Sequence, residues 1–429
     1  MPSNSQTVVQ RLVIAFFAVT LSWQVWAKEP QEPRLPLEEL RTFVEVMERI
    51  KSAYVEPIDD KTLLENAIKG MLNNLDPHSS YLDPKAFQEL QESTSGEFGG
   101  LGIEVGMEDD VLKVVSPIDD TPAFQAGIEA QDFIIKIDGQ PTKGMSLMDA
   151  VAKMRGKPGT SIVLTIAREN RAPFDVKLKR AIIKAQSVRA QTLEQGYGLI
   201  RISQFQSNTA NEVSKALRKL NQDKNNLLKG LVLDLRNNPG GLLQAAIDVT
   251  DLFIDQGLIV YTKGRLDNSE QNYFANSRTS IGDIPLVILV NSGSASASEI
   301  VAGALQDHKR GIVMGTNSFG KGSVQTILPL NNEHALKLTT ALYYTPLGRS
   351  IQAEGIEPDI VVERAKISQE QQSITIKEAD LVGHLNNDKS PSTTDKKNTA
   401  DAITDDYQLN QALNLLKGLN IIASKEKTQ

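Results

Sequence analysis

Residues 285–299 read PLVILVNSGSASASE, an apolar run that passes directly into a serine-rich turn. A short apolar run without alternation is typical of a strand buried on both faces of a parallel sheet. The residues after the turn, 300–305, continue with mostly apolar, helix-like spacing. A serine at such a strand-to-helix turn is well placed to act as a nucleophile. The stretch therefore predicts a mixed α and β core that carries a catalytic serine.

Spacing alone does not decide which serine of the turn is the nucleophile, because Ser294, Ser296 and Ser298 all lie in it. Ser296 and Glu299 match the capping-box pattern, so one interpretation is that Ser296 only caps the following helix. The two roles are compatible. Small alanines on both sides of Ser296 leave room for a scissile peptide, and the amide of Ala297, near a helix N-terminus, would donate to the oxyanion.

A glycine-flanked lysine follows in the segment FGKGSVQ at 319–325. A serine paired with a desolvated lysine is an alternative to a serine–histidine pair. Burial lowers a lysine pKa, by up to roughly 3 to 5 units in the extreme, so Lys321 would supply a neutral amine as general base. We expect the segment to open a strand with Lys321, Ser323 and Gln325 on one face, so that Gln325 orients the amine. The alternative is that Lys321 is an ordinary surface lysine in a turn.

A strand-to-helix turn with two glycines precedes the serine turn in the chain. Residues 230–235, GLVLDL, predict another buried strand, which ends in RNNPGG at 236–241 before an apolar helix. Gly240 and Gly241 would expose backbone N–H donors, as an oxyanion hole requires. A tight turn that uses glycine only for its backbone freedom is the alternative.

The composition limits the class of protein. A chain of 429 residues predicts two or three domains. Its formal net charge of -7, without a basic block, argues against nucleic acid as a partner. The absence of cysteine excludes disulfides, thiol catalysis and a lipoprotein anchor. Because the sequence also has no His-x-x-x-His pair, we expect neither a metal site nor a cofactor.

Residues 1–27 have the pattern of a signal peptide. Arg11 precedes the apolar run 12–21, and the residues VWA at 25–27 fit the small-residue rule for cleavage, which would start the mature chain near Lys28. We therefore expect an exported protein, in the bacterial periplasm. If the segment stays uncleaved as an anchor, the protein would associate with the inner membrane.

The segments that flank the core are predicted to be helical. Residues 35–95 show helical apolar spacing, interrupted by a turn at 75–84, and would serve either core packing or self-association. In the C-terminal tail, 366–429, the polar residues 388–405 predict a flexible linker. The helix after the linker has an apolar stripe that must pack on a surface of this chain or of another. The stripe consists of Leu409, Ala412, Leu413 and Leu416.

Residues 97–183 shift to short strands and turns with a single helix. The segment contains GGLGIEV at 99–105, a strand and turn at 133–139, and a helix at 146–155 capped by Ser146 and Asp149. This ordered set resembles a PDZ domain of the bacterial type. The resemblance implies that an extended peptide adds as a strand, with its carboxylate on a glycine-rich loop and its apolar side chains against the helix. The loop residues would be Gly100, Leu101, Gly102 and Ile103, and the helix residues Leu147 and Val151.

Several motifs in order resemble the carboxyl-terminal processing peptidases, the tail-specific protease family of serine peptidases. They are LDPHS at 75–79, the PDZ-like insert, DLRNNPGG at 234–241, the serine turn, FGKG at 319–322 and YTPLGRSIQ at 344–352. The resemblance covers nearly all of the chain after the signal segment. It implies a crotonase- and Clp-protease-like ββα core at 184–365, with the PDZ domain ahead of it. Carried over by position, it places the nucleophile at Ser296, the general base at Lys321, the orienting glutamine at Gln325 and the oxyanion donors at Gly240, Gly241 and Ala297.

The resemblance implies an exported serine endopeptidase that cleaves proteins or peptides recognised by apolar C-termini. It also implies a homo-oligomer, leaves room for an adaptor protein, and gives Arg155, at the end of the PDZ helix, a part in gating.

Two alternatives stay open. A Ser/His hydrolase on the same scaffold would use one of the four histidines, of which His308 and His334 lie in places that do not favour catalysis; the other two are His78 and His384. A non-catalytic PDZ scaffold is disfavoured by the intact serine, lysine and glutamine set.

Overall fold

The computed structural model describes residues 36–108, 110–221, 227–266, 270–276, 281–365 and 406–426. The predicted signal peptide and the predicted polar linker lie outside these ranges. The chain divides into two compact units, Met1–Met71 and Leu72–Gln429.

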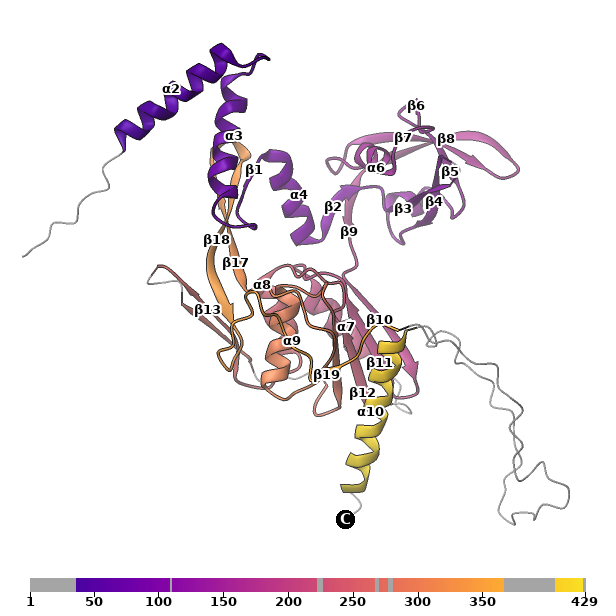
Figure 1. Cartoon of the computed structure of the whole chain (residues 1–429). Coiled ribbons are helices and arrows are strands. Elements are labelled where there is room, and N and C mark those ends of the chain that lie inside the picture. Colours follow the sequence, from indigo (N-terminus) through magenta and orange to yellow (C-terminus); the bar gives the residue numbers. More distant parts are fainter. Residues whose placement is uncertain are drawn as a thin grey trace, which may run out of the picture. The chain divides into compact units, whose positions relative to one another are not determined.

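The first unit consists of helix α2 (Leu37–Ala53) and most of helix α3 (Asp60–Asn73) (Figure 1). Glu38 in the first turn of α2 and Lys51 in its last turn complement the helix macrodipole. No residue of α2 is buried, and most of its large apolar side chains are exposed. Within the described ranges, no helix combines the length and the apolar character needed to cross a membrane.

A six-stranded sheet forms the centre of the second unit. Its strands lie in the order β10, β11, β12, β15, β16 and β19, and all neighbouring pairs after β10–β11 are parallel. Their bounds are Val188–Glu194, Tyr197–Ile202, Gly230–Asp234, Leu286–Val290, Ile312–Gly315 and Ile360–Val361.

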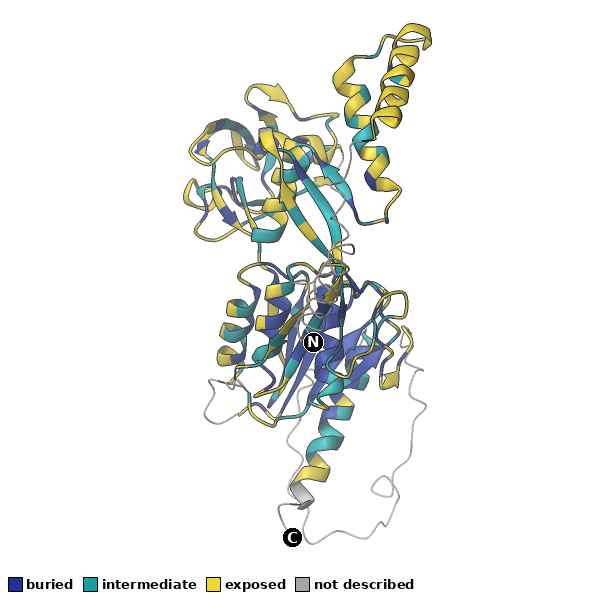
Figure 2. Ribbon diagram, turned by 90° about the vertical axis from the view of Figure 1, so that its left-hand side faces the viewer, coloured by how far each residue is buried: buried dark blue, intermediate teal, exposed yellow. Residues whose placement is uncertain are grey.

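Every residue of β12 and β15 is buried, which confirms that the two apolar runs form strands covered on both faces (Figure 2).

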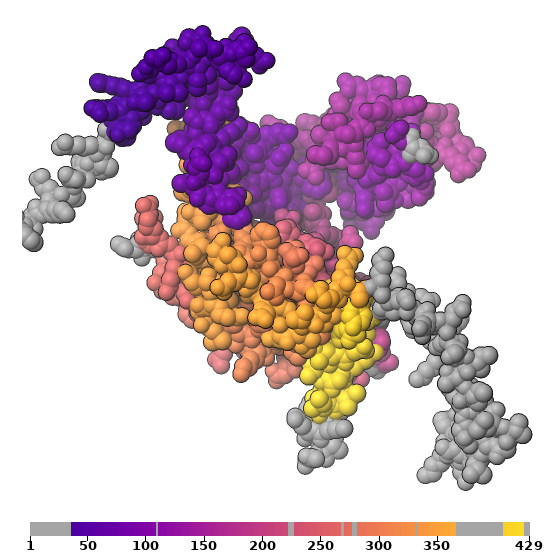
Figure 3. Space-filling view, in the orientation of Figure 1, coloured from indigo at the N-terminus to yellow at the C-terminus, as the bar shows by residue number. Residues whose placement is uncertain are grey.

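Helices cover both faces of this sheet. Successive side chains of a strand point to opposite faces, so the apolar strands present apolar side chains to the helices on each side. Leu233 faces the cluster formed with α7, α8 and α9, whereas its neighbour Val232 faces α10. These helices span Thr209–Leu220, Leu243–Asp251, Ala297–Asp307 and Tyr407–Glu426. The apolar stripe of the C-terminal helix therefore packs on a surface of the same chain (Figure 3).

A second sheet carries the hairpin that follows Lys321. In it β18 pairs with β1, β13 and β17, and β13 also pairs with β14. The strands span Ser80–Leu82 (β1), Leu258–Gly264 (β13), Gln271–Phe274 (β14), Ser323–Pro329 (β17) and Ala335–Tyr344 (β18). Helix α4 (Pro84–Ser95) follows β1 and begins at Asp83, whose side chain accepts a hydrogen bond from Ala86 N at 2.8 Å.

The PDZ-like segment has a hydrophobic core of its own. Its sheet runs in the order β3, β4, β5, β7 and β8, with β6 paired to β5, and the separate pair β2–β9 joins the two ends of the segment. The strands span Glu97–Gly100 (β2), Ile103–Glu108 (β3), Val111–Pro117 (β4), Phe133–Ile137 (β5), Gln140–Pro141 (β6), Ser161–Arg168 (β7), Arg171–Lys179 (β8) and Ala181–Lys184 (β9). The two helices span Pro122–Gln125 (α5) and Leu147–Met154 (α6). The predicted cap is confirmed, because Ser146 Oγ accepts a hydrogen bond from Asp149 N at 3.1 Å.

Candidate active site

Ser296 occupies the turn between β15 and α9 as the N-cap residue of α9, with φ 56° and ψ -113°. A positive φ is uncommon for a residue with a side chain, and such strain is concentrated at functional sites. The turn is held because the Ser296 N–H donates to Glu299 Oε2 at 2.7 Å, which is the reach-back half of the predicted capping box. The cap interaction and the presentation of the hydroxyl are therefore compatible, as the sequence suggested.

Burial distinguishes the three serines of the turn. Ser294 and Ser298 are both 0% exposed. Ser294 Oγ donates to Leu235 O at 2.8 Å and Ser298 Oγ donates to Asn238 O at 2.9 Å, so both tie the turn to the end of β12. Ser296 is partly exposed and lines a cleft. Of the three hydroxyls, that of Ser296 is the one placed to meet a substrate.

The cleft at Ser296 is bounded by α4, the start of α8, the start of α9 and the β17–β18 hairpin. Much of its wall is apolar, and its apolar side chains include Phe87, Leu90, Leu242, Ile300, Val324 and Ile327. Lys321 and Gln325 line the same cleft as Ser296. The structure thus brings together the serine, lysine and glutamine that the sequence selected.

A buried carboxylate joins the serine turn to the lysine loop. Glu299 is 0% exposed. Its Oε1 accepts from Ser318 Oγ and from Gly320 N, both at 2.6 Å. Its Oε2 accepts from Lys321 N at 2.9 Å, in addition to the Ser296 N–H. The sequence analysis assigned Glu299 only a capping role, because the bonds to the lysine loop are long-range contacts that spacing does not reveal.

Replacing Glu299 with glutamine is expected to lower both stability and activity. Glutamine keeps the volume of the side chain. Its NH₂ group, however, cannot accept hydrogen bonds from the two donors that it would face in place of a carboxylate oxygen. Two buried hydrogen bonds would be lost, at about 1–3 kcal/mol each, so the free energy of unfolding should fall by roughly 2–5 kcal/mol. Urea denaturation measures this loss, with the exposed Glu363→Gln as the matched control. An unchanged unfolding free energy would contradict the structural role of the carboxylate.

Lys321 lies in the loop before β17, not in the strand as predicted, since β17 begins at Ser323. The loop departs from strand geometry at Gly320, whose φ is 89°. Burial lowers the pKa of Lys321 below the usual lysine value, and the positive charge of Lys337 lowers it further. Asp76 and Glu299 act in the opposite direction without reversing the shift. The half-buried amine therefore has the electrostatic character of a general base.

Tyr343, on β18, holds the lysine loop at the cleft. Its hydroxyl donates to Lys321 O, and its side chain lines the same cleft as Ser296. Tyr343 is 2% exposed, and burial raises the pKa of its hydroxyl, which therefore remains protonated. The sequence analysis missed this residue, although the motif it quoted begins at the next position, Tyr344. The spacing of the chain carries no signal for a contact between a strand residue and a loop 22 positions away.

Gln325 is held by a hydrogen-bond network that reaches the turn at 75–84. Its Nε2 donates to Ser323 Oγ at 2.9 Å and to Thr339 Oγ1 at 3.2 Å. Thr339 Oγ1 in turn donates to Asp76 Oδ1 at 3.1 Å, and Asp76 also accepts from Ser79 Oγ at 2.6 Å. The amide nitrogen of Gln325 is thereby held by two hydroxyl groups.

The glycine turn approaches the serine turn closely. A Cβ on Gly240 would lie 2.8 Å from both Ala295 O and Ser296 Cβ, so only a glycine fits there. The Gly240 N–H donates to Asn238 Oδ1 at 2.9 Å. That donor is therefore engaged within the turn in this structure, and the role of Gly240 as an oxyanion donor stays a prediction. Gly241 and Ala297, which both line the cleft, remain as the candidate donors.

The histidines lie in different surroundings. His308 caps the far end of α9 and its Nε2 is 2.7 Å from Leu258 O, and His334 Nδ1 is 2.7 Å from the Tyr81 hydroxyl. His78 lies close enough to Lys321 to interact with its charge, and its pKa is lowered by burial and then by Lys321. His384 lies outside the described residues. A test of the Ser/His alternative must therefore include His78 beside His308 and His334.

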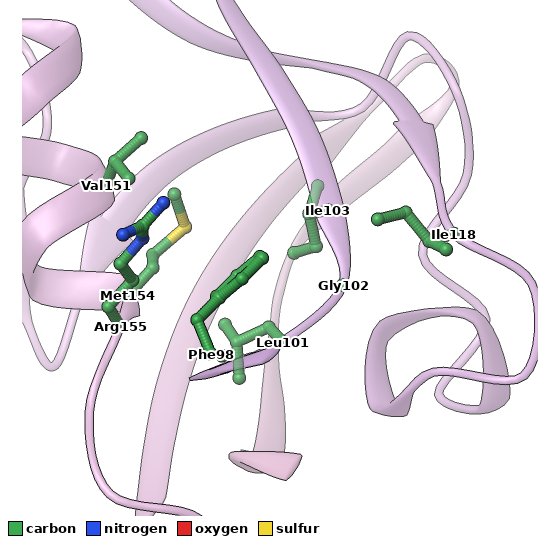
Figure 4. Close-up of a pocket in the computed structure, with 9 residues that line it drawn as sticks. Phe98, Leu101, Gly102, Ile103, Ile118, Val151, Met154 and Arg155 are labelled. Atoms are coloured by element: carbon green, nitrogen blue, oxygen red, sulfur yellow. The ribbon is translucent and has the colours of Figure 1, made fainter. Parts of the chain in front are cut away.

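The PDZ-like segment contains a groove between β3 and α6 (Figure 4). It is lined by Phe98, Gly100, Leu101, Gly102, Ile103, Ile118, Val151, Met154 and Arg155. The predicted loop residues and Val151 are therefore at the groove. Leu147, one turn before Val151 on α6, is not among the described residues that line it, so its contact with a peptide stays a prediction. Met154 and Arg155, about one turn after Val151, do line the groove.

Arg155 and Phe98 meet at the end of this groove. The Arg155 guanidinium carbon lies 4.6 Å from the centre of the Phe98 ring, a cation–π geometry, and its Nη1 is 3.7 Å from Glu92 Oε2 on α4. Arg155 thus links the groove to α4, the helix that forms one wall of the cleft.

A strained serine turn beside a half-buried lysine, on a parallel sheet and preceded by a PDZ domain, defines a serine-type peptidase. The family model of peptidase family S41 matches residues 196–362, that of the PDZ domain 99–178, and that of the activating protease CtpB N-terminal domain 20–86.

Relatives agree with these matches. The carboxy-terminal-processing protease of Bartonella bacilliformis is 50% identical over 89% of this chain and 89% of its own length. The carboxy-terminal processing protease CtpA of Bacillus subtilis is 38% identical over 74% of this chain and 67% of its own length. Among solved structures, the photosystem II D1 C-terminal processing protease is 31% identical, covers 75% of this chain and 87% of its own, and superposes with a TM-score of 0.44. The chain belongs to peptidase family S41, as a carboxy-terminal processing protease.

Proposed function

We propose that this peptidase is a Ser/Lys endopeptidase in which Ser296 is the nucleophile and Lys321 the general base. The observation that carries the proposal is the shared cleft: Ser296 and Lys321 both line it, and Tyr343, which also lines it, donates a hydrogen bond to the Lys321 carbonyl. The lowered pKa of Lys321 supports its role as a base.

The proposed reaction proceeds through an acyl-enzyme. The neutral Lys321 amine accepts the Ser296 proton while Oγ forms a bond to the scissile carbonyl carbon. The resulting oxyanion is stabilised by the N–H groups of Gly241 and Ala297, the latter at the N-terminus of α9. The Lys321 ammonium then protonates the leaving amine, and water releases the acyl group by the same steps. Gln325 orients the amine through its carbonyl oxygen.

Digestion of an unfolded reporter protein with an apolar C-terminal tail tests this proposal against the Ser/His alternative. We expect His78→Ala, His308→Ala and His334→Ala each to cleave the reporter at a rate within a few-fold of the wild type, because no histidine takes part in the reaction. Loss of the chemical step in any of them, with folding and peptide binding preserved, would favour the histidine mechanism.

We further propose that the PDZ groove recognises the C-terminus of the substrate. Gly102 has φ 75°, and a Cβ there would lie 2.3 Å from the Thr121 side chain, so the loop is shaped by glycine. Such loops present backbone N–H groups to a carboxylate, while the apolar side chains of Ile103, Val151 and Met154 would contact the terminal residues. The same clash makes Gly102→Asp an unsuitable test, because it would disturb the domain itself.

Amidating the C-terminus of an apolar peptide is expected to weaken its binding by about tenfold, because a charge-assisted hydrogen bond is lost. The measurement is fluorescence anisotropy with the full-length Ser296→Ala enzyme, which does not consume the peptide. Equal affinities for the free acid and the amide would remove tail recognition and leave the segment as a lid or spacer.

Three further features belong to this proposal. Export to the periplasm is supported by the signal-like pattern of the first residues.

Self-association is supported by the exposed apolar side chains of α2, among them Leu37, Leu40, Phe43 and Ile50. Gating by Arg155 is supported by its ion pair with Glu92 on α4. An adaptor protein remains compatible with the same surfaces.

A further inference from the structure

The cleft at Ser296 contains a second cation that the proposed mechanism does not use. Lys337, on β18, is half-buried and lines the cleft together with Lys321. Among the described residues that line the cleft, these two lysines are the charged ones, and none is a carboxylate. The positive charge of Lys337 therefore faces the space that a substrate occupies.

Strand geometry places Lys337 along the cleft and away from the reacting atoms. Lys337 and Thr339 are two positions apart on β18, so their side chains leave the same face of the strand about 7 Å apart. Thr339 contacts Gln325, whereas Lys337 is opposite Ile327, which also lines the cleft. The pair formed by Lys337 and Ile327 is thus two positions further along the hairpin than the pair formed by Thr339 and Gln325. An extended substrate would place a neighbour of the scissile residues there.

The ammonium of Lys337 has no internal counter-ion in the part of the chain that the structure describes, where none of the ion pairs includes it. The carboxylate of Asp76, which belongs to the Gln325 network, accepts hydrogen bonds from the Ser79 and Thr339 hydroxyls and forms no ion pair with Lys337 in the described part of the chain. A half-buried charge without a partner gains more from an anionic ligand than a solvated charge does.

We propose that Lys337 determines substrate specificity by binding a carboxylate of the polypeptide that is being cleaved. A polypeptide offers this group in two forms, the side chain of an aspartate or glutamate and the C-terminal carboxylate, and an ammonium binds both. The proposal rests on the proposed peptidase function and adds a preference for an anionic group near the scissile bond to the apolar character of the cleft.

The test compares matched fluorogenic peptides with the full-length enzyme. One series replaces a glutamine with glutamate at each position around the scissile bond in turn. In a second series, each peptide ends a few residues after the scissile bond, and its C-terminus is either a free carboxylate or an amide. In the wild type we expect kcat/KM for the anionic member of one pair to exceed that for the neutral member by about tenfold, as for one charge-assisted hydrogen bond. The series that shows the effect identifies the source of the carboxylate.

Variants of Lys337 assign the preference to this residue. The ratio within the responsive pair should fall to about 1 in Lys337→Met, persist in Lys337→Arg and invert in Lys337→Glu. The matched control is Lys263→Met, an exposed lysine on the neighbouring strand β13. The ratio is the readout because the charge of Lys337 also lowers the pKa of Lys321 and that of His78. Removing the Lys337 charge shifts the pH dependence of cleavage equally for both peptides of a pair, so the ratio is unaffected by that shift. The PDZ loop is the same in every variant, so it cannot cause a difference in the ratio between variants.

Salt provides a test that needs no variant, since raising the ionic strength should reduce the ratio in the wild type. Equal ratios in the wild type and in Lys337→Met, at every position and in both series, would overturn the proposal. If the wild type and Ser296→Ala cleave the peptides equally, the proposed role of Ser296 as nucleophile fails and this inference, which rests on it, fails with it. Cleavage that depends on Ser296 but shows no ratio dependent on Lys337 refutes the inference alone.

Discussion

Ser296→Ala is expected to reduce kcat/KM for an unfolded reporter by roughly 10⁴- to 10⁶-fold, as in other serine peptidases that lose their nucleophile. The hydroxyl removed is the one that faces the cleft. The fold should persist, because the bond from the Ser296 N–H to Glu299 uses the backbone and is kept in alanine. Reporter cleavage followed by gel or mass spectrometry measures the loss.

Two controls from the same turn sharpen this result. Ser292→Ala, at an exposed position, should leave both stability and turnover unchanged. Ser294→Ala should keep turnover while the protein is folded but lower the free energy of unfolding by about 1–3 kcal/mol, because Leu235 O loses its buried partner. If Ser296→Ala retained activity and Ser294→Ala or Ser298→Ala lost the chemical step, the nucleophile would be assigned to the wrong serine.

Lys321→Ala is expected to lower kcat by roughly 10²- to 10⁴-fold, the usual contribution of a general base. Lys321→Arg should be as inactive, since a guanidinium stays protonated and cannot accept the serine proton. In the wild type, kcat/KM should rise with pH through a lysine pKa that burial has lowered, because the amine acts as a base only after losing its proton. A profile that rises near pH 6.5, the usual pKa of histidine, and persists in Lys321→Ala would contradict the assignment.

The same pKa shift affects stability, with a definite sign. Between the lowered folded-state pKa of Lys321 and its higher unfolded-state pKa, the unfolded chain binds the additional proton. The free energy of unfolding should therefore gain a contribution that increases as the pH rises through this window. Lys321→Ala removes that contribution, which a comparison of urea midpoints across the alkaline pH range would detect.

The sequence by itself determined the features that depend on short spacing. The continuous apolar runs identified β12 and β15 as fully buried strands, because a strand covered by helices on both faces has no polar side. The Ser146–Asp149 spacing identified the cap of α6, since a cap bonds to residues within one turn. Ordered motifs also identified the peptidase family and the PDZ domain.

The tertiary structure decided what depends on contacts between distant segments. It distinguished Ser296 from Ser294 and Ser298 by burial, which three serines at alternate positions in one turn do not encode. It also added Tyr343 and the loop at Asp76 to the site. Asp76 and Thr339 are separated by 263 positions in the chain, and such a bond forms only because β1 pairs with β18. Local periodicity records which face of an element is buried, whereas strand pairing selects its partner. The pairing of the strands therefore decided which residues surround Lys321.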